Sequence, residues 1–325
     1  MKPKVYVTRS IPESAMTLLR EKCDVEAWPE ADAAVPRAEL ERQVASADAL
    51  LCLLTERIDD ALLALAPKLK VVSNMAVGYN NIDVEAANRR KVMVANTPGV
   101  LTETTADLTF ALLMATARRL FEASDDLRGG RWSTWSPMQW TGQDVYGATL
   151  GIVGLGRIGA ALARRAKGFD MKVLYHSRSR KAEEEAELGL EYAEFDRLLA
   201  ESDFVCVMTP YTPETHHLIG ARELALMKPT AMLINTARGG IVDEEALYEA
   251  LRNSAISAAG LDVFEREPVP TDHPLLALPN VVALPHIGSA SVRTRTRMAE
   301  LAARNALDGL FGSGPAHWVN RSAFE

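Results

Sequence analysis

The stretch TLGIVGLGRIGAALARRAKGF, residues 149–169, decides the fold. An apolar run ends at residue 153, three glycines follow at positions 154, 156 and 159, and a helical pattern begins directly afterwards. This spacing between a strand and a helix is typical of a dinucleotide-binding βαβ unit. The first glycine permits a tight turn, the second lets the backbone approach a pyrophosphate, and the third lets helix and strand pack closely. At the helix N-terminus we therefore predict a dinucleotide site formed by Gly154, Leu155, Gly156, Arg157, Ile158 and Gly159.

Apolar runs alternate with helical segments on both sides of this unit. Strands are expected near residues 148–153, 171–176, 203–208, 231–235, 258–263 and 281–284 in the second part of the chain. The first part has strand-like runs at residues 4–8, 47–54, 70–76 and 92–99. Such alternation predicts parallel sheets covered by helices on both faces. The predicted fold class is α/β with two doubly wound parallel-sheet domains, a Rossmann-type cofactor domain and a smaller flavodoxin-like domain, and a cleft between them.

Two helical segments suggest how the domains are divided. Residues 102–128 contain no Pro or Gly and are apolar over most of the helix circumference, which predicts one buried helix between the domains. Residues 291–311 are amphipathic, and only the first domain remains for them to pack against. We therefore expect residues 1–100 and 289–325 to form a discontinuous substrate domain. Residues 101–288 would form the cofactor domain.

The bulk composition is that of a folded protein with an acidic balance. The 325 residues are 48% hydrophobic and carry a net charge of −7, which argues against binding to nucleic acid or to an anionic membrane. Cys23, Cys52 and Cys206 are widely spaced and form no metal-binding pair, so no metal site is predicted. The first residues lack a signal-peptide pattern, and the apolar runs are too short to span a membrane. We expect a cytoplasmic protein.

A basic cluster lies in KVLYHSRSRK, residues 172–181. Enzymes that prefer NAD usually carry an acid here, which holds the ribose 2′-hydroxyl and would repel a 2′-phosphate. This chain instead offers hydroxyl and guanidinium donors, which suit a phosphate. We therefore predict that NADPH is preferred over NADH and is bound by Ser177, Arg178, Ser179 and Arg180. The alternative is a solvated helix start in which Arg180 and Lys181 pair with the acids of residues 182–187, and both descriptions hold if Arg178 alone meets the phosphate.

Three polar residues each follow an expected strand. Arg238 follows LINTA (233–237), Glu267 ends AAGLDVFERE (258–267), and His286 ends NVVALPH (280–286). Open α/β sheets bind ligands at the carboxyl ends of their strands. Together with GLGRIG (154–159) and AVGYNNID (76–83), these motifs resemble the D-isomer-specific 2-hydroxyacid dehydrogenases over essentially the whole chain. Within that family the chain is most similar to the glyoxylate/hydroxypyruvate reductases.

The resemblance implies that Arg238, Glu267 and His286 are the catalytic residues. His286 would protonate the forming alkoxide, Glu267 would orient the imidazole and favour its charged form, and Arg238 would bind the carboxylate and polarise the carbonyl. The implied reactions are reduction of glyoxylate to glycolate and of hydroxypyruvate to D-glycerate by NADPH, with NADH as a possible cofactor. Val77 and Gly78 match the positions whose N–H groups hold the substrate carboxylate. The remaining implied cofactor contacts are Thr209, Pro210, Thr236, Ala237, Arg238, Asp262, His286 and Gly288.

Exposed aromatic residues are expected in RWSTWSPMQW, residues 131–140. In the reductases that the chain resembles, this loop reaches the active site of the neighbouring subunit. The resemblance therefore implies a homodimer in which Trp135 forms part of the substrate wall, or alternatively one whose interface these tryptophans simply pack. Other activities also remain open: D-3-phosphoglycerate, D-lactate or phosphite dehydrogenase, and a non-catalytic NAD(P)H-sensing protein.

Overall fold

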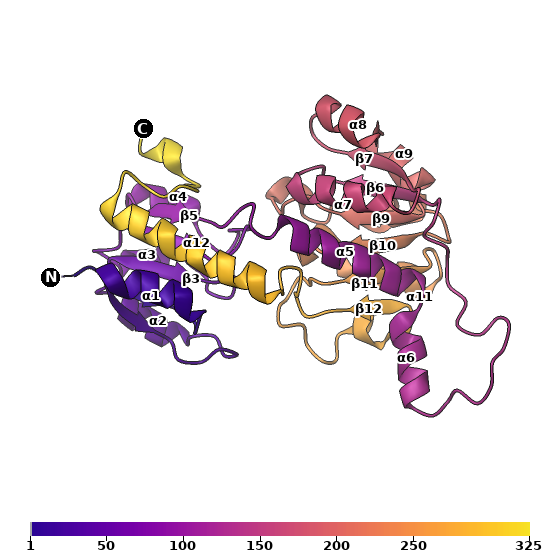
Figure 1. Ribbon diagram of the computed structural model, residues 1–325, viewed down its shortest axis with the longest axis horizontal. Helices are drawn as coiled ribbons and strands as arrows, with labels where there is room; N and C mark the ends of the chain where they lie inside the picture. Colours follow the sequence, from indigo (N-terminus) through magenta and orange to yellow (C-terminus); the bar gives the residue numbers. More distant parts are fainter. Residues whose placement is uncertain (1) are drawn as a thin grey trace. The chain divides into compact units, whose positions relative to one another are not determined.

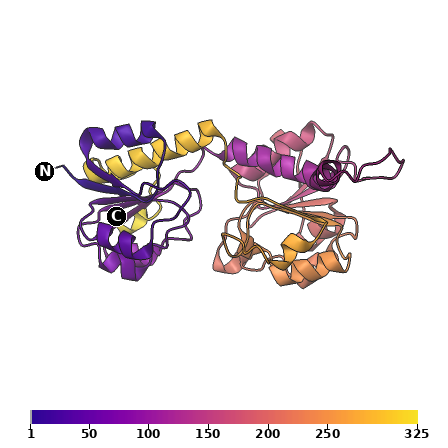
Figure 2. The same ribbon diagram turned by 90° about the horizontal axis from the view of Figure 1, so that it is seen from below.

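The computed structural model describes residues 2–325, and the chain divides into two compact units (Figure 1). The first unit runs up to Leu101 and resumes from Ala290 to Glu325. The second unit comprises Thr102–Ser289. Each unit has a parallel sheet with helices on both faces (Figure 2). None of the helices formed by the described residues is long and apolar enough to cross a membrane.

The first unit is built on a five-stranded parallel sheet of order β2-β1-β3-β4-β5. The strands are β1 (Lys4–Val7), β2 (Asp24–Ala27), β3 (Ala49–Cys52), β4 (Val71–Asn74) and β5 (Met93–Ala95). This order is the flavodoxin-like one. After β1 the chain adds β2 on one side of it and then β3, β4 and β5 on the other side. The loops that follow β1 and β3 therefore run in opposite directions at the carboxyl edge of the sheet.

Helices cover both faces of this first sheet. They are α1 (Glu13–Lys22), α2 (Arg37–Val44), α3 (Asp60–Ala64), α4 (Val84–Arg89) and α12 (Val292–Phe311). Val5 and Val7 of β1 face a core shared with α1 and α12, whereas Tyr6 faces the core of α2, α3 and α4. This alternation follows from the two-residue period of a strand. The C-terminal helix α12 therefore completes the fold of the N-terminal segment (Figure 2).

The second unit contains a seven-stranded parallel sheet of order β12-β11-β10-β9-β6-β7-β8. Its strands are β6 (Thr149–Val153), β7 (Lys172–His176), β8 (Glu191–Tyr192), β9 (Phe204–Val207), β10 (Met232–Asn235), β11 (Ala258–Leu261) and β12 (Val281–Ala283). The direction of strand addition reverses between β6 and β9. Doubly wound sheets bind ligands at the carboxyl edge beside such a reversal.

The helices of the second unit are α5 (Thr102–Ala117), α6 (Leu120–Arg128), α7 (Arg157–Lys167), α8 (Ala182–Leu188), α9 (Phe195–Glu201), α10 (Ala221–Leu226) and α11 (Glu244–Arg252). Helix α5 packs against α7 and against β10 and β11, and Leu112 and Leu113 are buried there. The predicted α/β class with a Rossmann-type domain and a flavodoxin-like domain is confirmed.

Two sequence expectations about individual elements are wrong. The single helix expected over residues 102–128 is two helices, because Arg119 has a left-handed φ of 50°. The carbonyl of Ala117 instead accepts the N–H of Gln143 at 2.9 Å, which ends α5 there. The short edge strands β2 and β8 were not expected. In β2 the exposed acids Asp24 and Glu26 alternate with half-buried residues, so no apolar run marks the strand.

Candidate active site

The three glycines of the phosphate loop lie between β6 and α7 and have different surroundings. Gly154 has a φ of +100°, and a Cβ there would lie 2.7 Å from the backbone nitrogen of Thr209. A Cβ on Gly159 would lie 2.7 Å from the carbonyl oxygen of Gly154. At Gly156, by contrast, no atom of the described residues other than its chain neighbours lies within 4 Å of the Cβ position. The first and third glycines are thus required by packing, and the second leaves open space at the N-terminus of α7.

That open space fits a pyrophosphate. Gly156 is the N-cap of α7, and the first turn of the helix carries no acidic residue. The first N–H groups of a helix lack intrahelical partners, and the dipole favours an anion at this end. Of the other predicted loop residues, Leu155 is buried, Ile158 is half-buried and Arg157 is exposed.

The basic cluster after β7 divides into two parts. The guanidinium of Arg180 forms an ion pair with Glu185 of α8 at 2.8 Å. Arg178 is exposed and forms no ion pair with any residue in the described range. The Ser177 hydroxyl donates to the carbonyl oxygen of Ser179 at 2.7 Å, which shapes the turn. The expected pairing of Arg180 with an acid of α8 is therefore present. Arg178 is not held in an ion pair within the described residues, and its charge contributes, after the hydroxyl of Thr212, to lowering the pKa of Glu214.

Strands β9 and β10 end in loops that carry further predicted cofactor contacts. The backbone of Thr209, just before Pro210, packs on Gly154. The Thr236 hydroxyl lies 2.7 Å from that of Thr109 on α5, so its side chain is already hydrogen-bonded within the unit.

His286 and Glu267 come together although they follow different strands. Nδ1 of His286 lies 2.6 Å from Oε2 of Glu267, and the N–H of Phe264 donates to Oε1 of Glu267 at 3.0 Å. Since Nδ1 is engaged by the carboxylate, Nε2 is the ring nitrogen left for proton transfer. His286 also has a φ of 53°, a left-handed conformation that costs a non-glycine residue free energy and that is enriched at functional sites.

The surroundings of Glu267 keep its carboxylate ionised. Burial alone would raise the pKa of Glu267, but the hydrogen bond and charge of His286, the N–H of Phe264 and the charge of Arg238 act in the opposite direction. The net result is a pKa below the usual value. An ionised Glu267 favours a proton on the Nδ1 atom of His286 and so orients the ring.

Arg238 is partly buried beside this pair. Burial lowers the pKa of Arg238 from its ordinary value, and the negative charge of Glu267 opposes that shift. Its Nη1 donates to the carbonyl oxygen of Ala237 at 2.7 Å. Arg238, Glu267 and His286 therefore form one electrostatic group at the carboxyl edge of the second sheet.

Asn235 holds the loop that carries Arg238. Its Nδ2 donates to the carbonyl oxygen of Arg238 at 2.8 Å, and its Oδ1 accepts the N–H of Ala237 at 3.0 Å. The side chain is almost completely buried. Sequence reasoning missed this residue, although an Asn directly after an apolar run is a common device for satisfying the backbone of a turn.

Asp262 has one carboxylate oxygen without a partner. Oδ1 accepts the N–H of Ile287 at 2.7 Å, whereas Oδ2 is buried and makes no hydrogen bond with the described residues. Burial raises the pKa of Asp262, and the N–H of Ile287, the charge of His286 and the nearby N–H of Gly288 oppose the shift. A Cβ on Gly288 would lie 3.3 Å from Oδ2. A buried acceptor without a partner fits a ligand N–H donor such as a carboxamide.

The loop with Val77 and Gly78 follows β4 in the first unit. The Nδ2 of Asn74 donates to the carbonyl oxygen of Gly78 at 2.9 Å, and the Nδ2 of Asn96 donates to that of Val77 at 2.8 Å. Because the carbonyls are engaged by these amides, the loop is held in one conformation. Neither asparagine was singled out by sequence reasoning.

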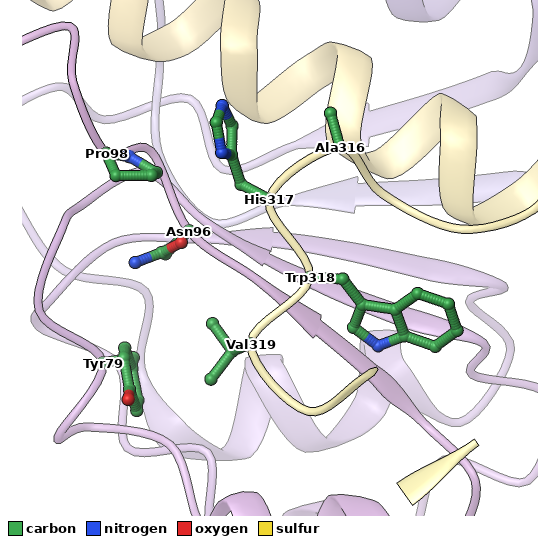
Figure 3. Close-up of a pocket in the computed structure, with 7 residues that line it drawn as sticks. All are labelled: Tyr79, Asn96, Pro98, Ala316, His317, Trp318 and Val319. Atoms are coloured by element: carbon green, nitrogen blue, oxygen red, sulfur yellow. The ribbon is translucent and has the colours of Figure 1, made fainter. Parts of the chain in front are cut away.

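A cavity of about 380 Å³ lies beside this loop in the first unit (Figure 3). The C-terminal segment forms one wall, and its Trp318 is paired antiparallel with Ala95 of β5. The lining residues are Tyr79, Asn96, Pro98, Ala316, His317, Trp318 and Val319. Within the described chain no cluster of His, Cys, Asp and Glu side chains is arranged to hold a metal ion.

The arm that follows α5 exposes apolar side chains. Helix α6 contains no buried residue, and Trp135 in the following loop is 74% exposed. Leu127, Trp132 and Met138 are also exposed. An apolar surface of this kind is typical of a protein–protein contact.

Comparisons with known proteins identify the family of the chain. Residues 110–288 match the model of the D-isomer-specific 2-hydroxyacid dehydrogenase NAD-binding domain. A glyoxylate reductase of Thermococcus gammatolerans is 53% identical over 325 residues, covering 99% of this chain and 97% of the relative. One of Korarchaeum cryptofilum is 52% identical over 322 residues, with the same two shares covered.

Solved structures share the fold of this chain over nearly its whole length. A protein of Thermus thermophilus superposes with a TM-score of 0.91 at 47% identity, covering 97% of this chain and 99% of the other. An NADPH-dependent glyoxylate/hydroxypyruvate reductase of Sinorhizobium meliloti, in complex with NADP and malonate, has a TM-score of 0.84 at 34% identity, covering 99% and 98%. The fold and the site thus define an NAD(P)-binding oxidoreductase. The chain belongs to the D-isomer-specific 2-hydroxyacid dehydrogenase family.

Proposed function

We propose that the protein reduces small 2-keto acids with NADPH as the preferred cofactor, converting glyoxylate to glycolate and hydroxypyruvate to D-glycerate. The observation that carries the proposal is the 2.6 Å contact between His286 and Glu267 beside Arg238. The names of relatives at 50–53% identity, all glyoxylate reductases, support the substrate.

His286 donates a proton from Nε2 to the carbonyl oxygen while the carbonyl carbon is reduced. When bound, the nicotinamide supplies the hydride for this reduction. Glu267 holds Nδ1, so the ring stays oriented with Nε2 left for the proton transfer. Arg238 attracts the substrate carboxylate and polarises the carbonyl group. We also propose that Val77 and Gly78 of the first unit offer their backbone N–H groups to a substrate carboxylate.

The cofactor preference rests on Ser177 and Arg178 within the predicted segment 177–180. Ser177 removes the negative charge that would repel a 2′-phosphate, and Arg178 offers a planar donor fork without an ion pair of its own among the described residues. Gly156 leaves room for a pyrophosphate, and Asp262 Oδ2 would accept a hydrogen bond from the nicotinamide carboxamide when the cofactor is bound. NADH binds the same loop without the contact to Arg178.

We further propose a homodimer formed through α6 and the loop after it. Trp135 and Leu127 are 74% and 59% exposed, and a second copy would remove this apolar surface from water. Trp135 would then contribute to the substrate wall of the partner subunit. The free thiols of Cys23, Cys52 and Cys206 suit the reducing cytoplasm, which is the compartment we propose.

Initial rates test the proposal. Oxidation of NADPH and of NADH is followed with glyoxylate, hydroxypyruvate, pyruvate and 3-phosphohydroxypyruvate at matched concentrations. Faster turnover of glyoxylate and hydroxypyruvate with NADPH is expected. Faster turnover of another 2-keto acid would assign another dehydrogenase of this family. Tight NADPH binding without turnover of any of them would favour a cofactor-sensing protein and contradict the enzymatic proposal.

A further inference from the structure

The loops that carry Arg238 and Glu267 meet at one peptide bond. Gly239 directly follows Arg238 and begins the short 3-10 helix η2 (Gly239–Ile241). A Cβ on Gly239 would lie 1.8 Å from the carbonyl carbon of Phe264 and 2.2 Å from the nitrogen of Glu265. The glycine therefore packs directly onto the Phe264–Glu265 peptide, and the position of Arg238 is tied to the turn that presents Glu267.

Glu244 binds the same peptide. It is the first residue of α11, and its Oε1 accepts the N–H of Glu265 at 2.8 Å. The Glu244 side chain is only 14% exposed. Burial raises the pKa of Glu244 above its ordinary value, and the N–H of Glu265 and the charge of His273 oppose that shift. This contact fixes the orientation of the Phe264–Glu265 peptide relative to α11.

Two histidines contact the carboxylates of Glu244 and Glu265 on either side of this peptide bond. Nε2 of His273 lies 3.1 Å from Oε2 of Glu244, and the His273 ring packs edge-on against Phe264 with centroids 6.0 Å apart. Nε2 of His217 lies 2.6 Å from Oε1 of Glu265. Both carboxylate oxygens of Glu244 thus have partners. The turn at residues 264–265 is held by Glu244 through the N–H of Glu265 and by His217 through the side chain of Glu265.

The turn connects this anchor to the catalytic pair. The N–H of Phe264 donates to Oε1 of Glu267 at 3.0 Å, and Oε2 of Glu267 receives Nδ1 of His286 at 2.6 Å. We propose that Glu244 is a positioning residue, which acts through the Phe264–Glu265 peptide to set Glu267 against His286. The role of His286 in this inference rests on the proposed function. Glu244 itself touches neither substrate nor cofactor in this scheme.

The test compares variants of Glu244 with a neighbour in the same helical turn. Glu244→Ala removes the acceptor, Glu244→Asp retracts it by one methylene, and Glu244→Gln keeps an acceptor oxygen at the same reach. Glu245→Ala is the matched control, because Glu245 is exposed and its carboxylate forms no ion pair in the described range. For each variant kcat and KM with glyoxylate, the Kd for NADPH and the thermal midpoint are measured.

A second readout does not require activity. In protein labelled with ¹⁵N-histidine, the Nδ1 proton between His286 and Glu267 should give a downfield signal, assigned by its loss in Glu267→Gln. We expect this signal to move in Glu244→Ala and Glu244→Asp and to stay in Glu244→Gln and Glu245→Ala. If the wild type turns over none of the 2-keto acids, the proposed function fails, and this signal alone decides the positioning role.

In the kinetic comparison we expect kcat to fall about 10- to 100-fold in Glu244→Ala and Glu244→Asp, since small displacements of catalytic groups have effects of this size. The Kd for NADPH should stay within about twofold of that of Glu245→Ala, and Glu244→Gln should recover most of kcat. Unchanged kcat in both shortened variants would overturn the proposal, as would an equal loss in Glu244→Gln and Glu244→Ala. If Glu244→Ala does not fold, Glu244→Asp decides, because Asp is well accepted in a first helical turn.

Discussion

Arg180 and Glu185 form a bidentate ion pair, with Nε 2.8 Å from Oε1 and Nη2 2.8 Å from Oε2. The hydrogen bonds from Arg180 and from the Tyr175 hydroxyl lower the pKa of Glu185 to about 2. The pair ties the end of the β7 loop to α8. Two arginines that look equivalent in the sequence therefore differ in the folded protein: Arg180 is held by Glu185, whereas Arg178 forms no ion pair with the described residues.

This difference predicts which arginine determines cofactor preference. Arg178→Ala should raise KM for NADPH by about 10-fold or more, as expected from losing a hydrogen bond to a charged group worth ~1.5–3 kcal/mol. KM for NADH should change little. Arg180→Ala is the control, with only a small effect expected, because its guanidinium is held by Glu185. Parallel KM measurements with both cofactors check the prediction, and an equal rise for NADPH and NADH in Arg178→Ala would contradict it.

His286→Ala should lower kcat for glyoxylate roughly 10²- to 10⁴-fold, the usual contribution of general acid catalysis. The Kd for NADPH should change much less, because the phosphate loop and Arg178 lie elsewhere on the sheet edge. Steady-state kinetics and a fluorescence titration with NADPH separate the two quantities. Equal losses of kcat and of cofactor affinity would mean that the histidine is structural.

The phosphate-loop glycines should respond differently to alanine. Gly159→Ala places a Cβ 2.7 Å from the carbonyl oxygen of Gly154, so we expect destabilisation. Overpacking of this kind costs about 1–3 kcal/mol. Gly156→Ala meets open space in the protein and should fold normally but bind NADPH weakly. Thermal unfolding and NADPH titration of both variants measure this, and a normal cofactor affinity in Gly156→Ala would contradict the placement of the pyrophosphate.

Glu267 should make stability depend on acid pH. Its pKa is lowered in the folded protein, so the folded state binds this proton less readily than the unfolded state. The contribution of Glu267 to the free energy of unfolding is therefore present above its unfolded pKa and is lost as pH falls through the folded value. We expect the stability difference between wild type and Glu267→Gln to shrink below about pH 4.5. Urea unfolding at pH 7, 5 and 4 tests the sign, and a difference that grows on acidification would show that it is wrong.

Local patterns in the sequence predicted most of the buried elements. The strands β1, β6, β9 and β10 were expected because short apolar runs bounded by turns are typical of buried strands in an α/β fold. The exposed edge strand β2 was missed because its residues carry no apolar run. The end of α5 was missed because its cause, the contact of Gln143 with Ala117, lies far along the chain.

In the candidate site, too, some residues could be predicted from local patterns and others could not. The positions of Arg238, Glu267 and His286 just after strands predicted that they lie at one edge of the sheet, where parallel strands bring their carboxyl ends together. Their catalytic role was implied by the resemblance of the surrounding motifs to the family. Their partners Asn235 and Glu244 could not be recognised in this way, since an Asn or a Glu near a turn is common in any loop. Only the distances to Ala237, Arg238 and Glu265 give these side chains a role.

The sequence by itself determined the α/β class, the position of the glycine-rich loop and the candidates for the catalytic set, because periodicity, glycine spacing and strand ends are local properties of a chain. The tertiary structure decided the rest. It paired Arg180 with Glu185 and left Arg178 without an ion pair among the described residues. It also left Oδ2 of Asp262 without a hydrogen-bond partner among those residues and placed Gly239 against the Phe264–Glu265 peptide. These contacts join residues that are far apart in the sequence and meet only when the chain folds. Hydrogen bonds and steric contacts depend on distances of a few ångströms in space, and the order of residues along the chain does not show which residues come that close.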